Sequence, residues 1–137
     1  MRSWRTRSTE ETRELGARLA RELAPDGVLL LTGDLGVGKT VLAQGVAEGL
    51  GIDPREVQSP SFTLIRQHQA AGSILLHVDL FRLEPEEAAA LGVEEMLAGE
   101  GVKVVEWAER LPFPVGGALV LRMQRLGESE REIEELE

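Results

Sequence analysis

Apolar residues near the start of the chain follow a helical spacing first and a strand spacing afterwards. A helix is predicted up to Ala24, because leucines recur at every fourth position, at Leu15, Leu19 and Leu23. Before it, Ser8-Thr9-Glu10-Glu11 has the pattern of a capping box, with Ser8 as the N-cap and Glu11 three residues later. The unbroken apolar run 28–32 instead predicts a strand that is covered on both faces, as in a parallel sheet.

Predicted helices and strands follow one another along the rest of the chain. We predict a helix that ends at Gly51 and another that opens at Glu84 and Pro85 and runs to Leu91. Further strands are predicted at residues 61–67, 74–80, 102–106 and 118–125. Strands that alternate with helices indicate a single α/β domain over residues 1–137 with a largely parallel central sheet. The acidic tail, about residues 126–137, is expected to be solvated without a fixed fold.

The amino-acid composition excludes several kinds of functional site. The chain has 137 residues, no cysteine, two histidines and a net charge of −9. Cysteine chemistry is therefore excluded, and a histidine-based zinc site is disfavoured. Acidic residues outnumber basic ones by 24 to 15, so tight direct binding of RNA is disfavoured, and a partner would supply the basic surface. No apolar run has the roughly 20 residues that span a bilayer, so we expect a cytoplasmic protein without membrane contact.

Residues 33–40 carry the most specific chemical signal. They read Gly-Asp-Leu-Gly-Val-Gly-Lys-Thr and fit G-x-x-x-x-G-K-[ST] at every position, between a predicted strand and a predicted helix. Backbone N–H groups of such a loop surround phosphate oxygens, and the glycines let it wrap closely, at Gly33, Gly36 and Gly38. Lys39 is expected to lie between the β- and γ-phosphates, and Thr40 to ligate Mg²⁺. The chain has no asparagine, so the guanine-reading N-K-x-D motif is absent and ATP is favoured over GTP.

Acids at strand ends complete the predicted site. Asp79 and Glu106 each follow an apolar run, which places them at the carboxyl edge of the sheet, and either could hold Mg²⁺ or its waters. The segment 59–63, Ser-Pro-Ser-Phe-Thr, fits either a switch loop at the γ-phosphate or an ordinary turn. Trp107 could cover the nucleotide or fill the core. His77 alternates with buried positions and is expected to be structural.

Four motifs in register resemble one known family. They are the phosphate-binding loop at 33–40, called the P-loop below, SPSFTL at 59–64, HVDLFRL at 77–83 and VEWAERL at 105–111. These motifs are similar to those of the TsaE (YjeE) family, the tRNA threonylcarbamoyladenosine biosynthesis ATPases. The resemblance covers residues from about 8 to 125. It implies a three-layer P-loop NTPase-like α/β fold with a mixed sheet. It also implies an ATPase that binds ATP and Mg²⁺, acts with the partner proteins TsaB and TsaD, and meets tRNA only through that complex.

The resemblance also assigns roles to residues. The expected catalytic residues are Lys39, Asp79 and Glu106, with Asp79 at the family's switch acid. Mg²⁺ would be held by Thr40 and Glu106. The expected nucleotide-binding residues lie in and around the P-loop or at its periphery, at Thr9, Asp34, Leu35, Gly36, Val37, Gly38, Lys39, Thr40, Val41, Trp107, Glu109 and Arg131.

Two other functions share these motifs. A small-molecule kinase would use the same loop, but it usually needs an arginine-bearing lid, and residues 84–99 contain neither arginine nor lysine. A nucleotide-gated binding module without turnover is not excluded by the sequence, because hydrolysis can depend on groups supplied by a partner. The chain also departs from the family pattern near the switch, with Val41 in place of a second threonine, and Ser61, Phe81 and Ala108 in place of threonine, tyrosine and proline.

Overall fold

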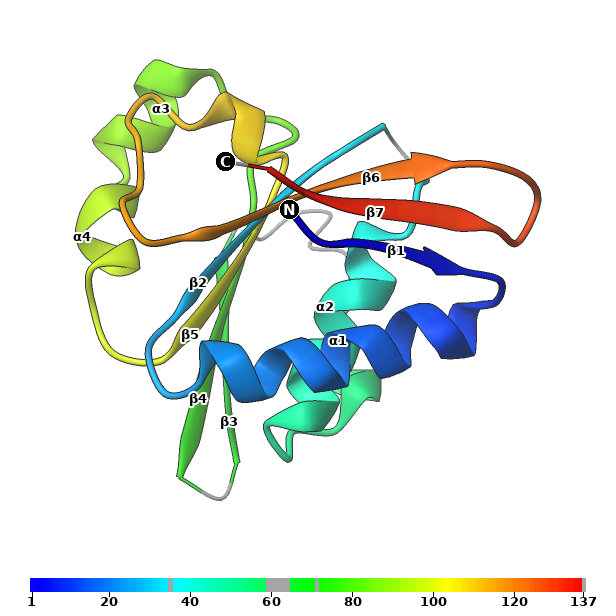
Figure 1. Cartoon of the computed structure of the whole chain (residues 1–137). Coiled ribbons are helices and arrows are strands. Elements are labelled where there is room, and N and C mark those ends of the chain that lie inside the picture. Colours follow the sequence, from blue (N-terminus) through cyan, green and yellow to red (C-terminus); the bar gives the residue numbers. More distant parts are fainter. Residues whose placement is uncertain (35, 59–64, 71, 137) are drawn as a thin grey trace.

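A mixed β-sheet lies between two groups of helices (Figure 1). The computed structural model describes the whole chain except residues 35, 59–64, 71 and 137. Within the described residues the sheet has seven strands, in the order β1-β7-β6-β2-β5-β4-β3. The strands are β1 (Ser3–Thr6), β2 (Val28–Thr32), β3 (Ile65–Ala70), β4 (Ser73–Asp79), β5 (Val102–Glu106), β6 (Leu119–Arg125) and β7 (Arg131–Leu136). The helices are α1 (Thr9–Leu23), α2 (Lys39–Gly49), α3 (Pro85–Ala90) and α4 (Val93–Leu97), with short 3₁₀ turns at Pro54–Glu56 and Ala108–Arg110.

The centre of the sheet is parallel and its flanks are antiparallel. Strands β6, β2, β5 and β4 pair in parallel, whereas β1–β7, β7–β6 and β4–β3 pair antiparallel. The predicted α/β class with a mixed sheet is therefore confirmed, and parallel pairing is confined to the middle of the sheet. All the parallel strands end at one edge, which is where the P-loop begins.

Side chains of successive residues in β2 face opposite layers. Leu29 and Leu31 pack with α1 and α2, while Leu30 packs with α3 and α4. Each face of the sheet thus has its own apolar cluster, which explains why residues 28–32 lack polar alternation. Helices α1 and α2 approach so closely that a Cβ atom on Gly45 would lie 2.1 Å from the carbonyl oxygen of Arg13. This contact fixes α2, and with it the P-loop that opens the helix.

The predicted element boundaries are mostly within two residues of the observed ones. Ser8 caps α1, because its Oγ accepts a hydrogen bond of 3.1 Å from the backbone N–H of Glu11. The reciprocal half of the predicted capping box is different: the Glu11 carboxylate accepts from the N–H of Arg7 instead of Ser8. Helix α4 was not predicted, and neither was β1.

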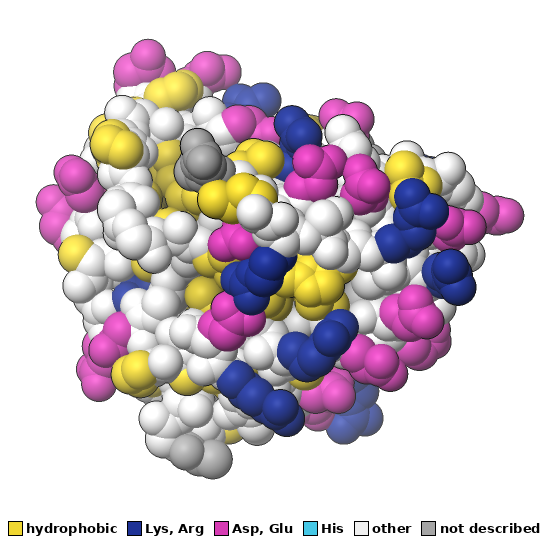
Figure 2. All heavy atoms as spheres, in the orientation of Figure 1, with side chains coloured by type: hydrophobic (Ala, Val, Ile, Leu, Met, Phe, Trp, Pro, Cys, Tyr) yellow, Lys and Arg dark blue, Asp and Glu magenta, His cyan; other side chains and the backbone are white. Residues whose placement is uncertain are grey.

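The expectation of an unstructured acidic tail is wrong for residues 131–136, which form β7 between β6 and β1. Ile133 is fully buried in the core beneath this strand. Two of the acids that suggested solvation pair with arginines instead: Glu134 lies 3.1 Å from Arg122 of β6, and Glu135 lies 3.1 Å from Arg2, which directly precedes β1. Figure 2 shows the result on this face of the molecule, where basic and acidic side chains are interspersed. The run of charges suggested an exposed segment, whereas residues 131–136 are half-buried or buried and pair with neighbouring strands.

Candidate functional site

The P-loop joins the buried strand β2 to α2 at the carboxyl edge of the parallel strands. Its described glycines, Gly33, Gly36 and Gly38, all have positive φ angles. At Gly33 the loop passes so close to β6 that a Cβ atom would lie 2.6 Å from the carbonyl oxygen of Met123. Only glycine can therefore occupy this position, and the loop is held against the end of the sheet.

Lys39 lies at the start of α2 with its side chain folded back into the loop. The side chain is buried, and its Nζ donates hydrogen bonds to the carbonyl oxygens of Gly33 and, at 3.4 Å, Asp34. The same ammonium lies 3.7 Å from the ring centroid of Trp107. Burial lowers the pKa of Lys39, and the nearby carboxylates, of which Glu109 acts most strongly, oppose this effect. A concentrated positive charge is thus held at the mouth of the loop.

Thr40 and Glu106 meet beside Lys39. The Thr40 hydroxyl is 3.1 Å from both carboxylate oxygens of Glu106, which is buried at the end of β5. A hydroxyl and a carboxylate are the oxygen ligands that Mg²⁺ prefers. The described residues contain no cluster of three or more His, Cys, Asp and Glu side chains able to hold a metal. This pair therefore fits an ion that takes its remaining ligands from phosphate and water.

Asp79 lies directly across from Glu106 at the end of β4. Its Oδ1 accepts a 2.9 Å hydrogen bond from the N–H of Phe81. Burial raises the pKa of Asp79; the Phe81 hydrogen bond opposes the rise and the Glu106 charge adds to it. The two acids predicted from separate strand ends thus lie side by side, as the carboxyl-edge rule requires.

These groups line one cleft of about 390 Å³. Its walls combine the P-loop, the start of α2 and the ends of β4 and β5, with Gly36, Gly38, Lys39, Thr40, Val41, Asp79, Phe81, Glu106 and Trp107. Trp107 is the one non-glycine residue with positive φ (61°) among those described. Its ring lies between Lys39 and Phe81, whose ring centroid is 4.9 Å away, and also packs against the α3–α4 cluster. Trp107 therefore lines the cleft and also packs against the core, while its expected contact with a nucleotide stays a prediction.

The peripheral residues of the predicted site divide between two further hollows. Thr9, Val41 and Arg131 line a hollow of about 80 Å³ on the other side of the P-loop, where the Nε of Arg131 donates a 2.8 Å hydrogen bond to the carbonyl oxygen of Val37. Glu109 is elsewhere, in a hollow of about 620 Å³ that it shares with Asp34.

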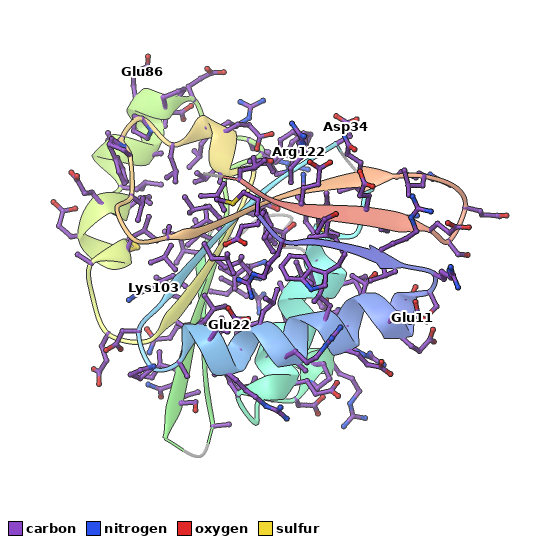
Figure 3. All side chains as sticks on the ribbon, viewed as in Figure 1. Glu11, Glu22, Asp34, Glu86, Lys103 and Arg122 are labelled. Atoms are coloured by element: carbon purple, nitrogen blue, oxygen red, sulfur yellow. The ribbon has the colours of Figure 1, made fainter. Side chains whose placement is uncertain are left out.

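The sequence did not indicate that the end of β6 lines this larger hollow. Arg122 and Arg125 both lie there. Figure 3 shows Asp34 and Arg122 at this same end of the molecule, whereas Lys103 lies at the opposite end of the sheet. A strand end beside a P-loop was the available signal, but neither arginine was singled out from the sequence. Phe81 was also missed as a site residue, although it follows Asp79 within a motif.

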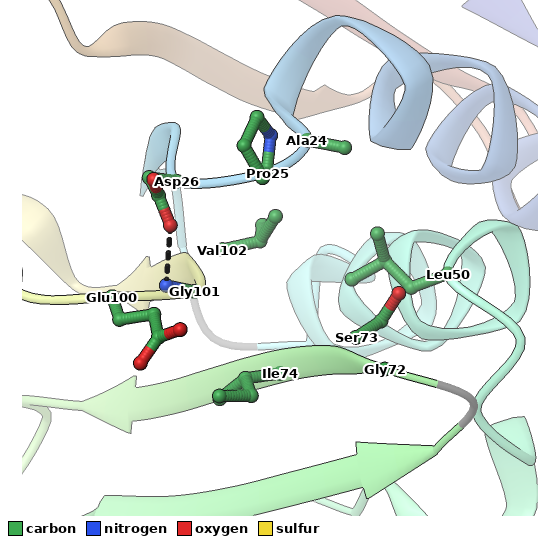
Figure 4. Close-up of a pocket in the computed structure, with 10 residues that line it drawn as sticks. All are labelled: Ala24, Pro25, Asp26, Leu50, Gly72, Ser73, Ile74, Glu100, Gly101 and Val102. Carbon is green, nitrogen blue, oxygen red and sulfur yellow. Dashed lines mark hydrogen bonds between the residues drawn. The ribbon is translucent and has the colours of Figure 1, made fainter.

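A hollow at the amino-terminal edge of the strands lies away from the P-loop cleft (Figure 4). It lies between the starts of β2, β4 and β5, and none of the predicted site residues lines it. There the Asp26 carboxylate accepts a 2.8 Å hydrogen bond from the N–H of Gly101, and the buried Lys103 donates to the carbonyl oxygens of Asp26 and Gly99. These bonds tie the strand starts together. The predicted nucleotide residue Leu35 and the predicted switch segment 59–63 lie outside the described residues.

The chain is similar to known proteins of one family. The family model "Threonylcarbamoyl adenosine biosynthesis protein TsaE" matches residues 6–133. The chain is 43% identical over 134 residues to a tRNA threonylcarbamoyladenosine biosynthesis protein TsaE from Bacillus subtilis, covering 95% of this chain and 82% of that protein. It is 35% identical over 130 residues to the protein of the same name from Treponema pallidum, covering 93% and 95% of the two chains. The crystal structure of Bacillus subtilis YdiB superposes with a TM-score of 0.74 at 38% identity, covering 96% of this chain and 82% of that one.

Proposed function

We propose a function from one established premise: this chain belongs to the TsaE family. We propose that it is a cytoplasmic P-loop ATPase that supports threonylcarbamoyl transfer to the tRNA adenosine 3′ of the anticodon. The observation that carries this proposal is the convergence of Lys39, Thr40, Asp79 and Glu106 on one cleft at the carboxyl edge of the sheet. The relatives are named for the same tRNA modification.

In this proposal the chain's own groups divide the work of binding and hydrolysis. The backbone N–H groups of the P-loop and the Lys39 ammonium bind the phosphates of ATP. Thr40 and Glu106 hold Mg²⁺, which when bound offsets negative charge on the β- and γ-phosphates. Asp79 orients the attacking water from β4, and Trp107 forms a wall of the cleft beside Lys39. Thr9, Val41 and Arg131 would contact the nucleotide beyond its phosphates.

The structure favours hydrolysis over transfer to a small molecule. A P-loop kinase would use the region after Asp79 as a mobile basic lid. Here that region forms α3 and α4, whose residues Ala88, Val93 and Leu97 are buried in the second apolar cluster. A segment anchored in the core without lysine or arginine is poorly suited to close over phosphates.

The charge distribution supports partner-dependent action. TsaB and TsaD are the partners we propose, with tRNA reached only through their complex. The face seen in Figure 2 offers no continuous basic surface for RNA, because arginines there alternate with acids. In the described part of the chain, no helix is long and apolar enough to cross a membrane.

The test is phosphate release from ATP by the purified chain, alone and with TsaB and TsaD. The proposal expects slow release alone and a steady rate that rises when both partners are present. Absence of any stimulated release would contradict an ATPase role. Labelled phosphate on a metabolite instead of in water would identify a kinase.

A further inference from the structure

His77 is a buried residue for which the proposed chemistry has no role so far. It lies on β4 directly beside Val104 of β5, with its ring completely inaccessible to solvent. Its Nε2 is 2.5 Å from the carboxylate Oε2 of Glu106, two residues further along β5. The contact is therefore a diagonal pair across two parallel strands, within reach because both side chains are long.

The hydrogen bonds around His77 indicate which group donates in its contact with Glu106. The Nδ1 of His77 is buried and has no partner among the described residues. A buried N–H without an acceptor is costly, so the proton belongs on Nε2, where the Glu106 carboxylate accepts it. The ring is thus a donor of one hydrogen bond, aimed at one oxygen of Glu106.

Glu106 is consequently held from two sides. Thr40 donates to its carboxylate from α2, and His77 donates from β4. The Thr40 hydroxyl can turn from the carboxylate toward a metal ion, whereas the imidazole has no other acceptor on the described residues to turn to. His77 is the fixed support of the two.

We infer that His77 is a positioning residue, whose Nε2–H fixes the carboxylate of Glu106 in the orientation that receives Mg²⁺. The inference rests on the proposed function, because it assumes that Glu106 meets a metal. Groups that hold a metal-binding carboxylate commonly change metal affinity by about 10- to 100-fold when they are removed. Lys39 and the P-loop amides do not depend on this bond, so nucleotide binding without metal is independent of it.

The experiment measures Mn²⁺ affinity by EPR in the presence of ADP, and ADP affinity in EDTA. His77→Ala is expected to weaken Mn²⁺ binding by about 10- to 100-fold and to leave ADP binding in EDTA unchanged. His77→Gln keeps an amide donor near the position of Nε2 and is expected to restore most of the affinity. His68→Gln is the matched control, since His68 is also buried on the β3–β4 hairpin but has no bond to Glu106 among the described contacts.

The possible outcomes distinguish the role of His77 from the proposed function of the chain. Mn²⁺ affinity in His77→Ala equal to that of the unsubstituted protein, with normal ADP binding, would overturn the role of His77 alone. Failure of the unsubstituted chain to bind ADP would overturn the proposed function and the inference together. If His77→Ala does not fold, the ¹⁵N spectrum of the unsubstituted chain decides: a proton on Nε2 and ring shifts on adding Mg²⁺ to the ADP complex are expected, and a proton on Nδ1 would contradict the inference.

Discussion

Lys39 and Lys103 are both buried lysines, but they lie at opposite edges of the sheet and bind different groups. Lys39 points into the cleft, while Lys103 donates to the carbonyl oxygens of Asp26 and Gly99. Methionine at either position keeps the length and removes the charge. We expect Lys39→Met to weaken ADP binding by 10-fold or more, as the loss of a charged hydrogen bond of about 1.5–3 kcal/mol implies.

Lys103→Met is the control and is expected to lower stability without lowering ADP affinity. It removes the hydrogen bonds that tie the backbone of Asp26 and Gly99 to β5, so the free energy of unfolding in urea should fall by about 1–3 kcal/mol. ADP affinity measured by calorimetry should stay unchanged. Equal losses of affinity in both variants would show that Lys39 acts through the fold instead of through phosphate.

Substitution of Asp79 should lower the rate of ATP hydrolysis and leave ATP affinity nearly unchanged. Asp79→Asn keeps an oxygen that can accept from the N–H of Phe81 but removes the charge that we assign to orienting water. ATP affinity should remain within a few-fold, and the rate of phosphate release should fall by about 10²- to 10⁴-fold. A rate equal to that of the unsubstituted protein would remove Asp79 from the mechanism.

His68 makes stability depend on pH. Burial lowers the pKa of His68 below its ordinary 6.5, and the neighbouring His77 acts in the same direction. Below that ordinary value the unfolded chain binds a proton that the folded chain does not, so the folded state loses stability as pH falls. Between about pH 8 and pH 5, His68→Gln should therefore lose less free energy of unfolding than the unsubstituted chain. Identical losses in urea titrations would contradict this assignment.

At the scale of elements, the contact between α1 and α2 sets the position of the P-loop helix. Gly45→Ala raises helix propensity by about 1 kcal/mol but places a Cβ atom against the carbonyl oxygen of Arg13. We expect the clash to dominate and to lower the free energy of unfolding by about 1–3 kcal/mol. Gly116→Ala is the control, because a Cβ atom there meets nothing within 4 Å. A stability gain in Gly45→Ala would mean that the two helices can separate at no cost.

Local patterns predicted the elements that depend on neighbouring residues. The strand–loop–helix around the P-loop is one example, and the pairing of Asp79 with Glu106 is another, since it follows from the rule that parallel strands end at one edge. Strands β1 and β7 were missed because they pair residues from opposite ends of the chain, such as Ser3 with Glu134. Each strand is short and charged, so neither has a signal until its partner is known.

At the scale of the whole molecule, that terminal pairing also shapes the site. Strands β1 and β7 lie side by side (Figure 1). Their antiparallel contact brings Thr9, which follows β1, to the same hollow as Arg131, which begins β7. The molecule thus presents its P-loop with a cleft on one side, formed by β4 and β5, and a hollow on the other, formed by its two termini. A nucleotide that spans the loop would contact both.

Calorimetric titration of the chain with ADP and Mg²⁺ tests this account most directly. The account requires association with a dissociation constant well below about 1 mM, weakened when EDTA removes the metal. It also requires a loss of 10-fold or more in Lys39→Met. No association of the unsubstituted chain at millimolar Mg-nucleotide would contradict the central claim that this cleft binds phosphate.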